Sequence, residues 1–305
     1  MKLLLGIVFI VVLVSSLGEL SSRSPVSDCG KSSLYKSHGV VVWSISGDHH
    51  AIFYKSSFAV DADGAYRAYH PDDRPGLDAL EHAGHPGDWW ALVTDNEKRG
   101  GRPVLQEKGD PAPGFYVSTT ALHDRDNRNV RDPRRCVDAA TVPYIVLQPK
   151  ALKYAKLGDF ATVVNLQNGK TSAAIVADVS APNLPLGEGS IALAKALGID
   201  SNSRTGGKSR DVVYVIYPGS GNRKPRGLQE ITTNSELIFE AWGGLEKLKT
   251  CLVELVQVLT VLEQRLMVLH VTERSFSSAV KGDTDRILRI RECVEVSGRR
   301  ISGAP

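Results

Sequence analysis

The sequence has few cysteines and no Cys-x-x-Cys pair, although it runs to 305 residues. Structural zinc sites and thioredoxin-like centres use closely spaced cysteines, so neither has much support. Nor is there an apolar stretch of eighteen or more residues, which is about the length that a membrane-spanning helix needs. These two absences point away from a zinc protein and from an integral membrane protein.

Two common catalytic motifs are also missing. Gly207-Lys208-Ser209 ends like a phosphate-binding loop, but the position of the first glycine of that motif holds Asn202. No Gly-x-Ser-x-Gly elbow occurs, so serine hydrolase chemistry has little support. The formal net charge of +3 is small, so nucleic acid is not a natural partner.

The chain begins with a leader-like segment. Residues 1–22 combine Lys2, an apolar core from Leu3 to Val14 and small residues after it, which is the pattern of a secretory signal peptide. The alternative is a retained membrane anchor, for which this core is short. We therefore expect an exported, soluble mature chain that is secreted from the cell.

Export permits disulfide bonds. The four cysteines are Cys29, Cys136, Cys251 and Cys293, and four cysteines allow three connectivities. Joining nearer parts of the chain favours Cys29–Cys136 together with Cys251–Cys293, and the sequence leaves the other pairings open.

The rest of the chain is organised around the stretch Ala173–Leu197. Its apolar run, Ala173–Ala177, is typical of a buried strand and ends at Asp178. A proline-rich turn leads on to Glu188 and then to a helix. Two carboxylates on either side of a cleft are the groups that hydrolyse a glycosidic bond. The alternative is an ordinary strand, loop and helix with two surface acids.

This stretch resembles the signature of the fungal-type chitosanases, glycoside hydrolase family 75. In that family an Asp that closes a Val-Ala-Asp-Val strand and a Glu in a Gly-Glu-Ala-Ser-like turn form the catalytic pair. The resemblance therefore implies catalytic roles for Asp178 and Glu188, although the turn here reads Gly-Glu-Gly-Ser. It covers roughly Gly39–Trp242, through segments that fit the family: Phe58–Gly64, Tyr69–Pro71, Trp89–Val93 and Asp110–Ser118.

Further residues are expected beside the substrate. The resemblance puts the acids of the turn Asp61-Ala62-Asp63-Gly64 near it, Asp61 above all because it closes a strand. The turn begins like a calcium loop but lacks the later glutamate, so a metal site is the less favoured interpretation. Adjacent residues on a strand point to opposite faces, so one of Trp89 and Trp90 can fill the core while the other stacks on a sugar. The expected substrate-binding set is Asp61, Asp63, Trp89, Trp90, Asp95 and Tyr116.

The charge of this region suits a cationic substrate. Between Asp48 and Glu97 there are ten acidic residues against three basic ones, a local balance of −7. An acidic face of this kind attracts a polycation such as chitosan along the wall of a cleft. A charge run is more often only solvated surface.

Short runs rich in β-forming residues fill the remaining sequence. They predict a hairpin over Gly39–Phe58, strands at Phe115–Ser118, Tyr144–Leu147 and Phe160–Leu166, an Asn-Gly turn at 167–170 and a strand at Val212–Tyr217. Many short strands with one helix after the acid-bearing loop predict a mainly β fold with a few helices. We expect the strands to close into a β-barrel of double-psi type.

The C-terminal part differs in kind. Leucines from Leu245 to Leu269 alternate steps of three and four, a heptad register that predicts a continuous helix from about Glu236 to His270. A second helix is expected near Thr284–Val296. The leucine stripe is expected to pack within the chain or to pair two chains. The predicted organisation is a signal peptide at 1–22, a chitosanase-like domain at 23–235 and a helical extension at 236–305.

The interpretation that unites these features is a secreted endo-chitosanase, for which the resemblance implies an inverting mechanism. Asp178 would be the general base that activates water, and Glu188 the general acid that protonates the leaving oxygen. Chitosan or its oligosaccharides are the expected partners, and no metal or organic cofactor is implied. The alternative is a non-catalytic, barrel-type polysaccharide-binding or wall-loosening protein. A third class is an oligomerising surface protein that depends on the leucine stripe.

Overall fold

The computed structural model describes residues 29–47, 50–207 and 209–252. The chain divides into two compact units, one formed by residues 28–247 and the other by residues 1–27 with 248–305. The expected signal peptide, Cys293 and most of the leucine stripe lie outside the described residues. Within the described ranges, no helix is both long and apolar enough to cross a membrane.

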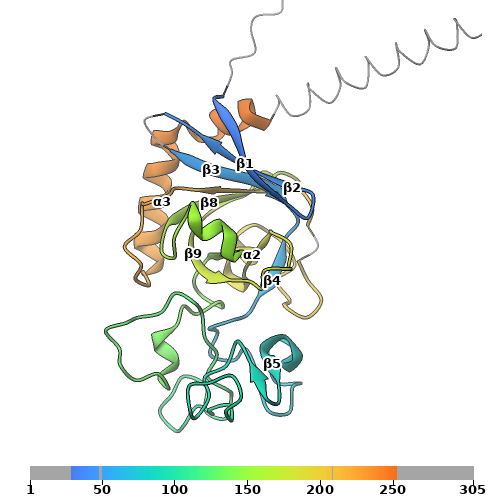
Figure 1. Ribbon diagram of the computed structural model, residues 1–305, viewed down its shortest axis with the longest axis vertical. Helices are drawn as coiled ribbons and strands as arrows, with labels where there is room; N and C mark the ends of the chain where they lie inside the picture. Colours follow the sequence, from blue (N-terminus) through green and yellow to red (C-terminus); the bar gives the residue numbers. More distant parts are fainter. Residues whose placement is uncertain (1–28, 48–49, 208, 253–305) are drawn as a thin grey trace, which may run out of the picture. The chain divides into compact units, whose positions relative to one another are not determined.

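A mixed sheet of nine strands forms the centre of unit 28–247 (Figure 1), in the order β1-β2-β3-β11-β8-β9-β7-β10-β4. A closed barrel requires the first and last strands of a sheet to pair with each other. Here β1 and β4 each pair with a single neighbour, so the sheet is open and the expected closed barrel is wrong. The strands are β1 (Lys31–Ser37), β2 (Val40–Ile45), β3 (Ala51–Ser56), β4 (Ala59–Asp61), β7 (Tyr144–Leu147), β8 (Phe160–Asn165), β9 (Thr171–Val179), β10 (Glu188–Ser190) and β11 (Val212–Ile216).

Local turn chemistry explains the antiparallel part of this sheet. β2 pairs with β3 and β8 pairs with β9, both antiparallel, which confirms the two hairpins expected from the sequence. Gly169 in the second turn has φ +73°, a conformation that glycine adopts without steric cost. Two pairings are parallel instead, β7 with β9 and β4 with β10, and these bring together segments far apart in the chain.

Two helices cover the sheet (Figure 1). α2 (Ile191–Ala196) packs against β9 and β10, while α3 (Leu228–Trp242) packs along β8 and β9. Their buried residues include Leu193 of α2 and Phe239 of α3. Together with the wholly buried strands β7, β8 and β11, they form the apolar core.

A long irregular segment, residues 62–143, joins β4 to β7. It contains only the 3-10 turns Leu80–Ala83 (η1) and Pro133–Arg135 (η2) and the two-strand ribbon β5 (Gly84–His85) and β6 (Asp88–Trp89). The expected strand Phe115–Ser118 is wrong, because its residues make only isolated bridges. Polar cross-links order this segment: Ser118 Oγ accepts from Gly64 N at 2.9 Å and donates to Ala91 O at 3.1 Å. A further 3-10 turn, η3 (Pro149–Lys153), follows β7.

The end of α3 corrects the expected C-terminal helix. α3 begins at Leu228 and ends at Trp242, and Gly243 caps it with φ +116°. A separate helical stretch covers residues 244–252, so a continuous helix beginning near Glu236 is wrong. The leucine stripe begins in this second stretch, where Leu245 is exposed.

The cysteine pairing also differs from the expectation. A disulfide bond joins Cys29 and Cys251, and Cys136 is a free thiol. Both favoured pairings are therefore wrong. Proximity along the chain was a poor guide to which cysteines meet.

Candidate active site

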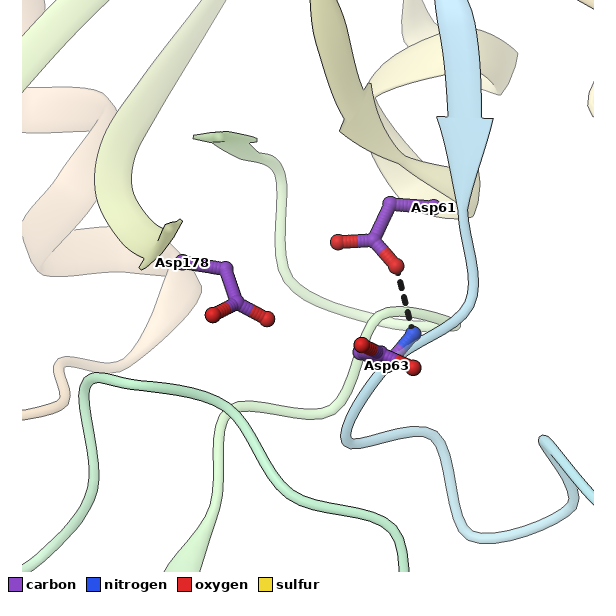
Figure 2. A group of neighbouring side chains, drawn as sticks. All are labelled: Asp61, Asp63 and Asp178. Atoms are coloured by element: carbon purple, nitrogen blue, oxygen red, sulfur yellow. Dashed lines mark hydrogen bonds between the residues drawn. The ribbon is translucent and has the colours of Figure 1, made fainter. Parts of the chain in front are cut away.

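Three carboxylates meet where β4 and β9 end (Figure 2). Asp61 is the last residue of β4, Asp63 follows in the turn, and Asp178 is the penultimate residue of β9. Each offers an oxygen atom within 4.8 Å of the others. Asp61 and Asp178 are only 8% and 9% exposed, so this group lies at the margin of the interior.

Strand register puts Glu188 on the same face of the sheet. Val146 of β7 pairs with Asp178 on one side and with Glu188 on the other, and directly paired residues point to the same face. In a flat sheet the Cα atoms of Asp178 and Glu188 would be two strand spacings apart, roughly 9.6 Å. Asp61 is one strand farther, so its approach to Asp178 requires the sheet to curl here.

Backbone donors hold Asp178 in place. Its Oδ1 accepts from Val179 N at 2.7 Å and from Ala121 N at 3.0 Å. The neighbouring Leu122 N donates to Ala177 O at 2.8 Å, so the irregular segment is fixed to the strand that carries the acid. The other oxygen, Oδ2, accepts no protein hydrogen bond from the described residues and is available for chemistry.

Asp61 and Asp63 are joined to two tyrosines. Asp61 Oδ1 accepts from Asp63 N at 2.8 Å, and Asp61 Oδ2 lies 3.0 Å from the Tyr144 hydroxyl. The same hydroxyl lies 2.9 Å from the carbonyl oxygen of Asp63. Tyr69 donates its hydroxyl proton to Asp63 Oδ1 at 2.6 Å. Among the described residues, protein groups therefore form hydrogen bonds with both carboxylate oxygens of Asp61 but with only one of Asp63.

Close packing around β10 fixes Glu188. Gly187 has φ +112°, and an added Cβ would lie 2.2 Å from the Ser57 carbonyl oxygen. Two residues after Glu188, Ser190 Oγ accepts from Leu193 N and from Tyr144 N and donates to Val142 O. Glu188 thus precedes the capping residue of α2. Within the described ranges, no protein hydrogen bond reaches its carboxylate.

Burial and mutual repulsion raise the pKa of these acids. Burial, and then the charge of Asp61, raise the pKa of Asp178 to about 8. Burial raises the pKa of Asp61 to about 6. Burial and the charges of Asp61 and Asp178 hold the pKa of Glu188 well above its usual value. Two unit charges 4.8 Å apart repel by about 3.5 kcal/mol at an effective dielectric constant of about 20. The group therefore retains protons at pH values where isolated carboxyls are ionised.

The other expected substrate residues lie outside this group. Trp89 is buried whereas Trp90 is 46% exposed, so the two side chains have the opposite environments that strand alternation predicts. Trp90 Nε1 donates to His82 O at 2.8 Å. Asp95 forms an ion pair with Arg102, and Tyr116 is half-buried with its backbone N donating to Tyr69 O. All four belong to the irregular segment, not to the sheet.

Tyr69 and Tyr144 are the site residues that sequence reasoning missed. Tyr144 begins a strand whose four residues are all buried, so its pattern is that of a core tyrosine. Tyr69 occurs in a Tyr-His-Pro segment that gave no sign of a partner. Nothing in their spacing indicated that their hydroxyls reach Asp61 and Asp63.

The three carboxylates have limited capacity for a cation. Ca²⁺ takes six to eight oxygen ligands, often several from carboxylates. Hydrogen bonds within the protein already engage both oxygens of Asp61, Oδ1 of Asp63 and Oδ1 of Asp178. Two oxygens, Asp63 Oδ2 and Asp178 Oδ2, stay without a protein donor in the part of the chain that the structure describes. A substrate bearing hydroxyl and ammonium donors is a better complement to them.

The comparison with known families covers part of this site. Residues 118–249 match the model of a family described as fungal chitosanase of glycosyl hydrolase group 75. The matched region includes Tyr144, Asp178 and Glu188, whereas Asp61 and Asp63 precede it. No curated protein matches the chain. The match confirms the resemblance drawn from the sequence and supports a chitosanase-type glycoside hydrolase.

Proposed function

Starting from the match to the chitosanases of group 75, we propose that the chain is a secreted endo-chitosanase that hydrolyses β-1,4 bonds between glucosamine units with inversion. The alignment of Asp178 and Glu188 across β7, on one face of the sheet and inside the matched region, carries this proposal. The leader-like residues 1–22 support the export step.

Asp178 is the general base. Its Oδ1 is held by two backbone N–H groups, which favour the ionised form, while Oδ2 is left to take a proton from water. A pKa near 8 would leave the free carboxyl largely neutral in acid. A bound glucosamine ammonium lowers that pKa, since an opposite charge favours the carboxylate.

Glu188 is the general acid. Its pKa is raised by burial and by its anionic neighbours, which keeps a proton on it for the leaving oxygen. It lies before Ser190, the capping residue of α2, and so it is outside the first helical turn, where the dipole would favour the carboxylate. The environments of Asp178 and Glu188 thus differ in the way that a base and an acid require.

The substrate class follows from charge. Several acids of the region 48–97, including Asp61, Asp63 and Asp78, lie in or near the site, and chitosan is a polycation. Asp63 Oδ2, with no protein donor among the described residues, is suited to an ammonium or hydroxyl group of the sugar. Trp90 exposes one aromatic surface on which a sugar ring can stack.

Sheet geometry supports inversion. An inverting pair needs carboxyl groups about 6.5–9.5 Å apart so that a water molecule fits, whereas a retaining pair needs about 5–5.5 Å. Asp178 and Glu188 are on different strands with β7 between them, an arrangement that leaves room for that water. Glu188 is also absent from the group of oxygens that lie within 4.8 Å of one another.

The test is release of reducing ends from chitosan by the full chain and by two isosteric variants. Asp178→Asn and Glu188→Gln should each lower kcat by about 10²–10⁴-fold, because each removes one proton transfer. Asp211→Asn is the matched control, since the Asp211 side chain is 44% exposed, forms an ion pair with Lys55 and is not among the three clustered carboxylates. Binding of chitosan with no reducing ends from the parent would instead indicate a polysaccharide-binding protein. A folded Asp178 or Glu188 variant with half the parent rate would refute that residue's role.

A further inference from the structure

The Tyr144 hydroxyl lies between two oxygen atoms that each need a hydrogen-bond donor. Asp61 Oδ2 is 3.0 Å away and the backbone carbonyl oxygen of Asp63 is 2.9 Å away. A carbonyl oxygen only accepts, and a tyrosine hydroxyl has one proton to donate. No other donor to the Asp63 carbonyl occurs among the hydrogen bonds of the described residues. One more proton is needed to complete both contacts.

Asp61 can supply that proton from Oδ2. Its Oδ1 already accepts from Asp63 N, so this oxygen is the acceptor of the carboxyl group. If Oδ2–H donates to Tyr144, and Tyr144 donates to the Asp63 carbonyl, each of the three oxygens has one partner of the right kind. With Asp61 ionised, Tyr144 can donate to only one of the two oxygens, the buried Asp61 Oδ2 or the part-buried carbonyl of Asp63, and an acceptor left without a donor away from water is costly.

The surroundings of Asp61 favour its neutral form. The groups that face it are Tyr144 from β7, Asp178 from β9, Glu188 from β10 and Asp63, Tyr69 and Asp78 from the irregular segment. All are acids or hydroxyls, and no salt bridge to a basic side chain reaches Asp61 within the described ranges. A third negative charge beside Asp63 and Asp178 would meet only repulsion. Burial raises the pKa of Asp61 in the same direction.

We propose that Asp61 is a positioning residue whose carboxyl group is protonated in the active protein. It is the first donor in a series of hydrogen bonds that runs from Asp61 Oδ2 to the Tyr144 hydroxyl and from there to the backbone carbonyl of Asp63. These two hydrogen bonds hold the turn that contains Asp63 beside Asp178. A neutral Asp61 adds no repelling charge beside Asp178, and the bound glucosamine ammonium lowers the pKa of Asp178 from its value of about 8 in the free site, so that Asp178 can act as the base. This inference rests on the proposed chitosanase function for its catalytic consequence, but not for the protonation itself.

Asparagine is the natural probe, because its amide reproduces the neutral acid. The oxygen can accept from Asp63 N while the NH₂ group donates to Tyr144. Asp61→Ala removes both contacts and should lower kcat about 10–100-fold through misplacement of the turn. Asp61→Asn should restore most of that loss. The acidic limb of its pH profile for kcat/KM should stay within about 0.3 units of the parent, since no charge has been removed.

An anionic Asp61 predicts the opposite profile. Removing a negative charge would lower the pKa of Asp178, so the acidic limb of Asp61→Asn would move to lower pH by about one unit. Failure of asparagine to rescue the alanine variant, or such a shift, overturns the proposal. Circular dichroism of both variants establishes that they are folded.

An infrared difference spectrum tests the protonation without any activity. At about pH 5, below the raised pKa of Asp61 of about 6, the parent minus Asp61→Asn spectrum should contain a carboxylic acid carbonyl band. Asp211→Asn is the control, because the ion pair with Lys55 lowers the pKa of Asp211, and it should lose only a carboxylate band. Loss of a carboxylate band in Asp61→Asn overturns the proposal. If the carbonyl band is present but the protein does not hydrolyse chitosan, the proposed function is refuted and the protonation of Asp61 is still supported.

Discussion

Replacing Gly189 with alanine tests how closely β10 packs beside the proposed acid. A Cβ at this position would lie 2.8 Å from the Tyr144 backbone oxygen, 2.7 Å from Leu193 Cδ2 and 3.1 Å from Phe58 Cζ. The leucine end can turn aside, but the carbonyl belongs to β7, with which β10 pairs. The methyl group therefore has to push β10 away from its neighbour.

The magnitude follows from two opposing effects. Overpacking of a well-packed core costs about 1–3 kcal/mol, while alanine recovers about 0.4–1 kcal/mol by restricting the unfolded chain. We expect Gly189→Ala to lower the free energy of unfolding by about 1–2 kcal/mol. Because Glu188 is adjacent, kcat on chitosan should also fall, up to about 10²-fold for a displacement near 1 Å.

The assay is urea unfolding of the parent and the variant, followed by kcat on chitosan. Gly100→Ala is the matched control, because its Cβ would have only one neighbour within 4 Å, at 3.5 Å. Equal stability of Gly189→Ala and Gly100→Ala, with full activity, would refute the packing argument.

Two further predictions concern pH and stereochemistry. The free energy of unfolding should fall as pH rises from about 4 to about 8, because Asp61 and Asp178 have raised pKa values of about 6 and about 8 and so keep protons that the unfolded chain releases near 3.8. Each such proton contributes a slope of about 1.4 kcal/mol per pH unit. The free energy of unfolding, measured by urea titration at several pH values, should fall less steeply with pH in Asp178→Asn than in the parent, by the slope of one proton. Identical slopes would contradict the raised pKa of Asp178. Proton NMR of fresh hydrolysate should show the α-anomer first, since inversion turns the β-linkage into an α-product; an initial β-anomer would make Asp178 a nucleophile.

Most strands of the fold could be predicted from the sequence, because the patterns that indicate them are local. The Asn-Gly turn before β9 and the apolar runs of β7 and β11 depend on neighbouring residues alone. Whether the sheet closes into a barrel could not be predicted from the sequence. Closure depends on whether β1 pairs with β4, and no local pattern encodes the partner of an edge strand. The same limit explains the disulfide between Cys29 and Cys251.

For the site, the sequence predicted a pair of acids, which stays a prediction, and did not indicate the tyrosine hydroxyls that contact Asp61 and Asp63. Asp178 and Glu188 were identified through a family resemblance and their place after a strand and a turn. Tyr144 could not be distinguished from a core residue by its sequence. Its contact with Asp61 depends on two parallel pairings, of β7 with β9 and of β4 with β10, which join segments far apart in the chain. Hydrogen-bond partners more than 80 positions apart leave no trace in periodicity.

The parallel pair of β4 and β10 has a consequence for folding. Ala59 pairs with Glu188 and Asp61 with Ser190, so closing this contact requires a loop of well over a hundred residues, and such contacts form late because of their entropic cost. Asp61 therefore joins Asp178 and Glu188, which are aligned through β7, only after this long-range contact has formed. A chain with native β2–β3 and β8–β9 hairpins but without this contact would lack Asp61 beside Asp178. During refolding, the recovery of hydrolysis should lag behind the recovery of β-sheet circular dichroism.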